Sequence, residues 1–382
     1  MKKTVFILCC LLIPGLPPLS AATITVPSLE IYTRGAPEGN GFGFESKGEI
    51  DLLLTGGYKF AGTFGLSFED ASLEDPVAGL GDGLFFKTAK ITVRELFSLP
   101  LDLTYFIGYN QTLGSGEEYS YLFGTLPAAT RYRGYLHFPD SVEYDGLHQI
   151  NGTGLQLDYA GKEQRVFLSI YAYQDSLIDD DDDPATPFIF ETGYYSADFR
   201  ALLRFQDVIL EAFAGGTYPA PSSQDFLCRA GLLFYAANKD VEFLTQLGIP
   251  RWAPLHEQLD IDAFYLLVEP RVHAGPLSII PTFFWRPAYY LQQATKEKSF
   301  DMNLDLRLGR VESSKILGGL ESNFVYMIEE DGIEVSELRA KVTPYLQFLT
   351  AGAIWEIRVV TSVWPFSLDD LVECFLTVKA EF

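Results

Sequence analysis

Four histidines and many carboxylates are the residues of this chain that could carry acid–base or metal chemistry. None of the histidines stands in a spacing that binds catalytic zinc, such as H-E-x-x-H. In the segment "YDGLHQ", Asp145 precedes His148 by three residues, but we match this segment to no enzyme motif and interpret His148 as an ordinary loop residue. The sequence therefore predicts a protein that is not an enzyme and that uses no cofactor.

The densest group of like charges is the run "DDDDDP". Ca²⁺ prefers carboxylate and other oxygen ligands, and a calcium site is therefore the functional interpretation. Calcium-binding loops need alternating acids around a central glycine, however, and this run has neither. Contiguous like charges repel one another and stay solvated, so we favour a loop without a metal. The weak calcium candidates are Asp179, Asp180, Asp181, Asp182 and Asp183.

Charged side chains also recur at every second position of several segments, where they alternate with apolar ones. A β-strand with this pattern has one polar and one apolar face. Polar faces that line a channel select solutes by charge. Ion pairs that only hold the wall together are the alternative for each residue singly. The candidates for the channel lining are Lys90, Arg94, Asp102, Asp198, Arg200, Arg204, Asp305, Arg307, Glu337, Arg339, Lys341, Glu356 and Arg358.

Alternating segments continue from residue 23 to the end of the chain, and most have the length of a tilted membrane strand, about 9–11 residues. The weakest are 23–33, which contains Pro27, and the short 240–247. Without these two the count falls to sixteen, and fourteen is the fewest we consider. We predict eighteen strands, at 23–33, 43–55, 58–69, 85–96, 100–110, 151–160, 164–174, 193–205, 208–217, 226–236, 240–247, 259–270, 276–286, 298–309, 314–326, 335–347, 351–363 and 373–382.

The predicted connections alternate between short turns and long loops. Membrane barrels have short periplasmic turns and long outer loops, so this order places both termini in the periplasm. A soluble sandwich does not require such an order. The expected turns include 160–163, 205–207, 237–240, 272–275, 310–314 and 349–352, and the expected long loops are 70–84, 111–150, 175–192, 248–258, 287–297, 327–334 and 364–372.

The longest connection, residues 111–150, has two interpretations of equal weight. It extends outward as two further strands, "EYSYLFGT" and "RYRGYLHF", or it folds into the lumen as a constriction. A loop of this length inside a compact domain is usually functional. If it folds inward, Arg131 and Arg133 help to line the channel and complete the set of candidates.

The first residues resemble an export signal. Lys2 and Lys3 precede an apolar run, and small residues follow at 20–22, which predicts a cleaved signal peptide over 1–22 and a single domain over 23–382. Past residue 22 we find no uninterrupted apolar stretch of roughly 18 residues, the length that a spanning helix needs. The formal net charge of −23 argues against nucleic acid as a partner.

The last residues also alternate, and the pattern runs to the terminal side chain. Leu376, Val378, Ala380 and Phe382 are separated by polar residues. Chain ends usually fray, so a pattern carried this far needs a reason. A terminal phenylalanine after alternating apolar positions resembles the signal that the barrel-assembly machinery of Gram-negative-type bacteria reads.

The export signal, the alternation, the loop order and the terminal phenylalanine together resemble an outer-membrane β-barrel of the porin class, although no named porin family is matched by motif. The resemblance implies an all-β fold, a transmembrane antiparallel barrel of 16–18 strands. Such wide barrels leave an aqueous channel, and the implied function is passive diffusion of small hydrophilic solutes. The implied partners are outer-membrane lipid, the assembly machinery and further copies of the chain in a homotrimer.

Two other functions stay open at this stage. A hydrophobic-substrate transporter of the fatty-acid type also uses a wide barrel, but it would need an N-terminal plug. A surface adhesin or structural barrel would make the loops the functional part.

Aromatic residues form 14% of the chain, which fits an aromatic girdle at the membrane interfaces. Four aromatics at the expected outer strand ends are the candidates for this girdle, namely Trp252, Phe284, Trp285 and Trp364.

Overall fold

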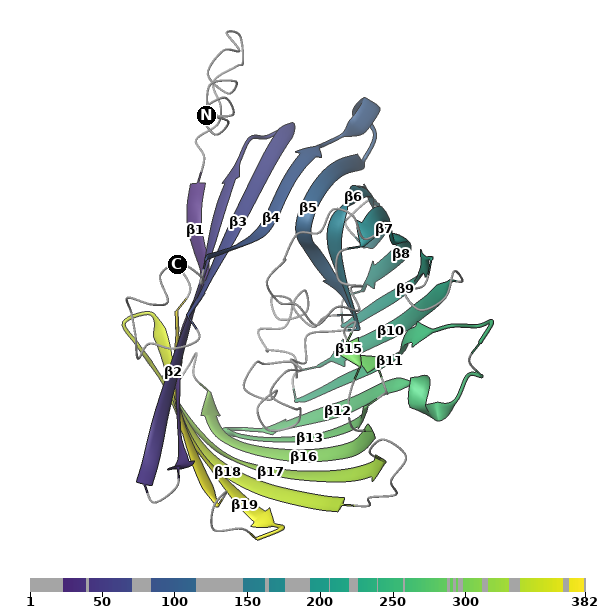
Figure 1. Ribbon diagram of the computed structural model, residues 1–382. Helices are drawn as coiled ribbons and strands as arrows, with labels where there is room; N and C mark the ends of the chain where they lie inside the picture. The colour runs from purple at the N-terminus through teal and green to yellow at the C-terminus, as the bar shows by residue number, and fades with distance from the viewer. Residues whose placement is uncertain are drawn as a thin grey trace.

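The computed structural model consists almost entirely of β-strands (Figure 1). It describes residues 23–38, 41–70, 84–114, 147–161, 165–175, 193–205, 207–219, 226–238, 240–256, 258–286, 289–290, 293–294, 298–310, 315–329, 337–366 and 371–380.

The main sheet contains 18 strands. They are β1 (Thr23–Glu38), β2 (Gly41–Gly56), β3 (Phe60–Asp70), β4 (Leu84–Val93), β5 (Leu101–Leu113), β6 (His148–Ala160), β7 (Val166–Asp175), β8 (Tyr195–Arg204), β9 (Val208–Tyr218), β10 (Leu227–Ala237), β11 (Val241–Trp252), β12 (Tyr265–Ala274), β13 (Leu277–Arg286), β16 (Lys298–Arg310), β17 (Ile316–Glu329), β18 (Glu337–Thr350), β19 (Ala353–Trp364) and β20 (Val372–Ala380). The short pair β14 (Tyr289–Tyr290) and β15 (Gln293–Ala294) lies outside this sheet.

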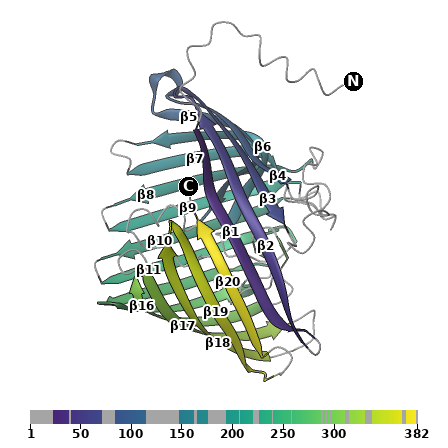
Figure 2. The same cartoon turned by 90° about the vertical axis from the view of Figure 1, so that its left-hand side faces the viewer.

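Every strand of the main sheet is antiparallel to its neighbours, which are the strands before and after it in the chain. β1 pairs with β2 and also with β20, where residues 29–35 face residues 374–380 (Figure 2). Each of the 18 strands therefore has a neighbour on both sides. The pairings form a continuous ring, which removes the unpaired edges that a sheet otherwise exposes.

The main sheet contains the larger number of the predicted 16–18 strands, and the fourteen strands that we considered possible are too few. Both strands that the sequence marked as weak are present, as β1 and β11. Pro27 lies where the β1–β2 register shifts, so its missing N–H is tolerated at an irregular position of the ladder. β12 begins at Tyr265 rather than 259, because the side chain of Asp260 accepts from the amide of Ile261 and caps a single 3₁₀ turn, η4 (Ile261–Ala263).

The connections alternate in length as predicted, with one exception. Short turns such as 205–207, 238–240 and 351–352 join strands at one end of the ring, which we call the short-turn end. The longer connections meet the other end, the long-connection end. The exception is β1–β2, where only residues 39–40 intervene because both strands are 16 residues long.

The two faces of the sheet have the reverse of the polarity found in a soluble domain. On β8, Asp198 and Arg200 are 3% and 6% exposed, whereas Phe199 between them is 46% exposed. The same contrast recurs around the ring, because every strand of the main sheet carries at least one large apolar side chain that is exposed. The polar faces therefore point into the ring and the apolar faces point outward.

Some aromatic side chains do not lie where the sequence suggested. Phe284 was a girdle candidate, but it points inward, is buried, and packs against Tyr265 with ring centroids 5.1 Å apart. Phe375, the one break in the alternation of β20, also points inward, where it is buried with Val360. Trp364 is exposed at the end of β19.

Among the described residues, no helix is long and apolar enough to cross a bilayer.

Candidate functional site

The inner wall of the ring carries buried ion pairs, and the first joins β8 to β10. Arg229 donates through Nε to Oδ1 of Asp198 at 2.7 Å and through Nη2 to Oδ2 at 2.6 Å. Its Nη1 donates to the hydroxyl of Thr217 on the intervening strand β9, at 2.7 Å. Tyr173 on β7 donates to Asp198 Oδ2 at 2.9 Å. This fork satisfies both carboxylate oxygens, as a bidentate arginine pair does.

A glycine makes room for this pair. Gly215 lies opposite Asp198 in the β8–β9 register. A Cβ atom at Gly215 would lie 1.9 Å from Oδ1 of Asp198, so a larger residue would displace the carboxylate from Arg229. His148 joins the same group, because its Nε2 lies 3.0 Å from the hydroxyl of Tyr173. The residue that we interpreted as an ordinary loop histidine is therefore the first residue of β6 and is buried.

A second pair links the wall to the start of the long connection after β5. Arg200 donates through Nε to Oε1 of Glu211 at 2.9 Å. The amide of Gly114 donates to the same oxygen, also at 2.9 Å. Gln246 on β11 donates to the carbonyl oxygen of Gly114 at 2.7 Å. The tip of the β5–β6 hairpin is thus bonded to the inner faces of β9 and β11.

The other side of this tip is held by packing. Gly231 and Gly248 face each other across the β10–β11 pair on the inner wall. Leu147 lies over them, because a Cβ atom on Gly231 would lie 2.7 Å from its Cδ1 and one on Gly248 would lie 3.1 Å away. Leu113 and Leu147 are both buried in the same apolar cluster. We call Leu113, Gly114 and Leu147 the stem of the long connection, and it points into the ring.

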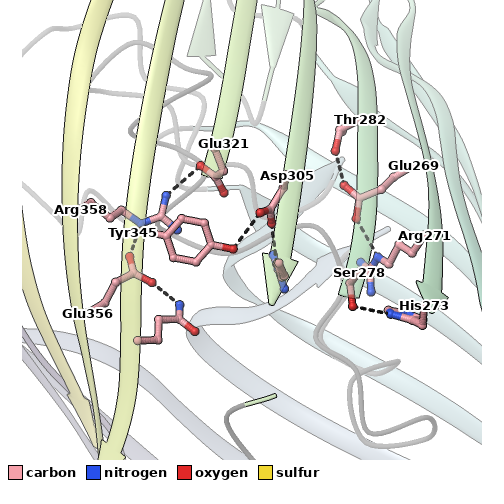
Figure 3. Close-up of polar contacts among 12 residues, drawn as sticks. Glu269, Arg271, His273, Ser278, Thr282, Asp305, Glu321, Tyr345, Glu356 and Arg358 are labelled. Atoms are coloured by element: carbon pink, nitrogen blue, oxygen red, sulfur yellow. Dashed lines mark hydrogen bonds and ion pairs between the residues drawn. The ribbon is translucent and has the colours of Figure 1, made fainter. Parts of the chain in front are cut away.

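A third group lies on β11–β13 (Figure 3). Arg271 donates to Glu269 at 2.8 Å and to Glu242 at 3.0 Å. His273 places Nδ1 2.8 Å from the hydroxyl of Ser278 and Nε2 3.0 Å from Oε1 of Glu242. Every member of this group is at least largely buried, so the charges compensate one another within the wall.

A fourth group spans β16–β19 (Figure 3). Arg307 donates to Asp305, and the hydroxyl of Tyr345 donates to the same carboxylate at 2.8 Å. Arg358 donates to Glu321 at 2.9 Å and also to Glu356. Its guanidinium carbon lies 4.8 Å from the centre of the Tyr345 ring, a cation–π distance. These contacts link the side chains of four successive strands, β16 to β19, on the inner face of the wall.

The structure places the channel-lining candidates in two classes. Those in the middle of strands, Asp198, Arg200, Asp305, Arg307, Glu356 and Arg358, are all ion-paired. Lys90 donates to the carbonyl oxygen of Asn110 at 2.7 Å. Those near strand ends are more exposed, as for Arg94 and Arg339, or partly exposed, as for Asp102, Arg204 and Lys341. The contact of any of them with a solute stays a prediction.

Several of the residues that the sequence singled out lie outside the described residues. They are Arg131 and Arg133 in the long connection, the acidic run Asp179, Asp180, Asp181, Asp182 and Asp183, and Phe382. Glu337 begins β18. In the ranges that the structure describes, no group of three or more His, Cys, Asp or Glu residues could hold a metal ion.

The sequence missed the partners that complete these groups, notably Arg229, Glu211, Gln246 and Arg271. Their strands carry a weaker alternation signal. In β12, "YLLVEPRV", leucine and tyrosine occupy inward positions next to Glu269 and Arg271, so apolar residues appear on both faces. The sequence signal that could have identified these residues is their position, because each of them lies on the polar face of its own strand.

Comparison with known proteins identifies the architecture. No protein-family model and no curated protein matches the sequence. Among solved structures, a BenF-like porin from Pseudomonas fluorescens is similar with a TM-score of 0.54 and 10% identity, over 95% of this chain and 99% of that chain. OprB of Pseudomonas putida has a TM-score of 0.48 and 10% identity over 94% of both chains. A mutant porin of Rh. blastica has a TM-score of 0.45 and 9% identity, over 95% of this chain and 100% of that chain. The likeness to the BenF-like porin shows that the chain has the β-barrel fold of bacterial porins.

Proposed function

We propose that the chain is an outer-membrane channel for the passive diffusion of small hydrophilic solutes, exported with a signal peptide over 1–22. The observation that carries this proposal is the polarity of the ring, in which charged side chains are buried inside and large apolar side chains are exposed outside. An apolar outer surface is costly in water and favourable in lipid. A ring of 18 strands is wide enough to leave an aqueous channel between its inner faces.

The backbone supports the same conclusion. Lipid offers no hydrogen-bond partners, so a β-structure is stable there only if its strands pair on both sides. The β1–β20 pairing satisfies this condition for the first and last strands. The strand that makes this pairing, β20, contains Leu376, Val378 and Ala380 of the proposed assembly signal, whose last residue is Phe382. Deletion of Phe382 should then leave exported protein that fails to insert, and surface labelling of cells would measure the loss.

The stem favours the in-folded interpretation of residues 111–150 over the outward one. Gly114 is held by Glu211 and Gln246, and Leu147 lies over the glycines of β10 and β11. Both ends of the connection are therefore directed at the inner wall. We propose that the connection narrows the channel, with Arg131 and Arg133 facing the solute.

The two rival functions receive less support. A transporter for hydrophobic substrates would need an apolar path and a plug, whereas residues 23–38 form β1 in the wall and the inner face carries ion pairs. An adhesin would depend on the loops, and it would not need an open lumen. Conductance separates both rivals from a diffusion channel.

The test is a measurement on refolded, signal-free protein in planar bilayers, combined with heat-dependent migration in gels. We expect stable unitary currents and liposome swelling in small sugars. Cross-linking of the same sample tests the proposed homotrimer. A matched control is Leu304→Arg, which puts a charge on the outer face of β16 and should prevent insertion. Inserted, folded wild-type protein that passes no current would refute the channel.

A further inference from the structure

A groove of about 420 Å³ lies on the outer face of β2–β5, close to the short-turn end. It is lined by Gly56 of β2 and Gly62 of β3, which are partners in the β2–β3 register. A Cβ atom at Gly62 would meet no atom within 4 Å. Two neighbouring residues without side chains therefore leave a hollow in a face that otherwise presents large apolar groups.

Aromatic side chains bound this hollow. Phe60 and Phe64 lie two positions before and after Gly62 on the same face of β3, and both are exposed. The register then places Ile91 of β4 beside Gly62 and Tyr105 of β5 beside Ile91. Both of these residues line the groove and are also exposed. A hollow between aromatic rings, open along its length, fits a flexible apolar chain.

Packing rather than the hydrophobic effect decides what fills the groove in a membrane. Lipid tails are as apolar as the wall, so moving a tail from the bilayer to the wall gains nothing from solvation. A tail inside the groove touches protein on more than one side, whereas a tail on a flat wall touches it on one. Each atomic contact is weak, so a polar group that binds the head of the same molecule is needed to hold it there.

Such polar groups occur where the groove meets the short-turn end. Tyr58, Lys59 and Arg94 are all exposed there. The amide of Arg94 donates to the carbonyl oxygen of Lys59 at 2.9 Å, so the two basic residues lie opposite each other, directly beyond Phe60. Lysine and arginine keep their stems on apolar surface and their charged ends in water. Both donate strongly to phosphate. Glu95 is exposed beside them, so the strand ends do not select a head by its net charge.

We propose that this groove binds one phospholipid of the leaflet at the short-turn end. One acyl tail lies over Gly56 and Gly62, and the phosphate accepts from Lys59 and Arg94. The inference rests on the membrane location in the proposed function, and it adds a lipid site that passive diffusion does not require. A second copy of the chain would present another apolar face to the groove. It would leave the donors at the strand ends without an acceptor, which is why we favour the phospholipid.

The test is photolabelling of refolded, signal-free protein in micelles of a maltoside detergent, which contains no phosphate. The probe is a phosphatidylglycerol with a diazirine at the end of one acyl chain, and mass spectrometry maps the adducts. We expect them to concentrate on the peptides that contain Phe64 and Tyr105. Unlabelled phosphatidylglycerol should displace the probe about tenfold better than diacylglycerol with the same chains, which is the value of a hydrogen bond to a charged group.

Two variants separate the tail site from the head site. Gly62→Leu fills the groove and should remove the concentrated labelling. Gly318→Leu is the matched control, because Gly318 is also near the short-turn end, on β17, and a Cβ atom there would lie 3.8 Å from its nearest neighbour. This change should leave the labelling intact. Lys59→Gln combined with Arg94→Gln should make diacylglycerol and phosphatidylglycerol equal competitors.

Adducts spread evenly over the outer face would overturn the proposal, as would unchanged labelling in Gly62→Leu or equal displacement by the two lipids in the unaltered protein. Cross-links between two copies at Phe64, in place of lipid adducts, would assign the groove to a second copy and also overturn it. A labelled groove in protein that passes no current would refute the channel and keep the site. Conductance with evenly spread adducts would refute the site and keep the channel.

Discussion

Two arcs of the barrel wall differ in what they present to the lumen. The arc β5–β13 has an inner face rich in buried aromatic and aliphatic side chains, such as Phe106, Tyr171 and Phe213, which form one apolar cluster with the stem. The arc β16–β19 has an inner face of carboxylates, guanidinium groups and amides, and its apolar clusters are small. The first arc therefore packs against the stem, and the second is the polar surface that we expect a solute to meet.

This difference shows that one barrel wall can present a polar surface to water in one arc and an apolar contact to another segment of the chain in the other arc. A barrel needs its inner wall to be polar only where water or solute touches it. Where the chain folds back on the wall, burial of apolar side chains stabilises the contact by about 25 cal/mol per Å². Glycines at Gly231 and Gly248 then matter because they allow close approach of Leu147. The predictions below test this division of the wall, from the largest expected effect to the smallest.

The largest effect should follow from breaking the ion pair of the apolar arc. Arg229→Leu leaves the buried Asp198 carboxylate without its bidentate partner, and we expect a loss of about 3–5 kcal/mol in the free energy of unfolding. Urea unfolding in lipid vesicles measures it. The double change with Asp198→Asn removes the stranded charge and should recover part of the loss. An effect below that of Arg339→Gln, an exposed residue, would contradict the structural role of the pair.

The outer and inner faces of β16 should differ nearly as much. Leu304→Arg places a charge on the outward face and should cost about 2–4 kcal/mol near the bilayer midplane. Asn303→Arg, one residue away on the inward face, should be tolerated beside Asp301 and Asp305 and should alter the conductance instead. Refolding yield and unitary current measure the two results. Equal tolerance at both positions would indicate a soluble sheet with its apolar face in a core.

A large side chain at Gly231 should displace the stem from the inner wall. Gly231→Leu puts a side chain where Phe213 and Leu147 lie, since a Cβ atom there would be 2.4 Å from Phe213 and 2.7 Å from Leu147, and overpacking of this kind typically costs about 1–3 kcal/mol. If the stem holds a constriction, the unitary conductance should rise. Gly62→Leu is the control, because no atom lies within 4 Å of a Cβ at that outward position. A conductance that stays at the wild-type value in folded Gly231→Leu would mean that the stem does not narrow the channel.

The smallest effect is expected for an exposed charge of the polar arc. Arg339 lies toward the long-connection end of β18 and is exposed. Arg339→Gln should change the unfolding free energy by no more than about 0.5 kcal/mol. The reversal potential in a salt gradient should shift toward cations at low salt. The shift should vanish near 1 M salt, where the screening length is about 3 Å. A shift that persists at high salt would place Arg339 in a confined part of the channel.

The sequence by itself determined the number, order and approximate bounds of the strands. Alternation at period two is a local property, and the turns that separate the strands are local as well. All eighteen segments appear in the main sheet, including the one with Pro27. The alternation of short and long connections follows for the same reason, except at β1–β2, where two long strands leave only residues 39–40 between them.

Only the tertiary structure decided which face points inward, which charges pair and where the stem of the long connection lies. A period of two assigns residues to two faces but does not say which face meets water. The Asp198–Arg229 pair joins strands that are not neighbours, and the Gly114–Glu211 contact joins residues 97 positions apart. Such contacts depend on the assembled wall, because side chains of strands that are not neighbours come within reach of one another only on the inner face of the formed sheet. Phe284 shows the same limit, since an aromatic residue near a strand end can face the lumen or the lipid and only the assembled wall selects between them.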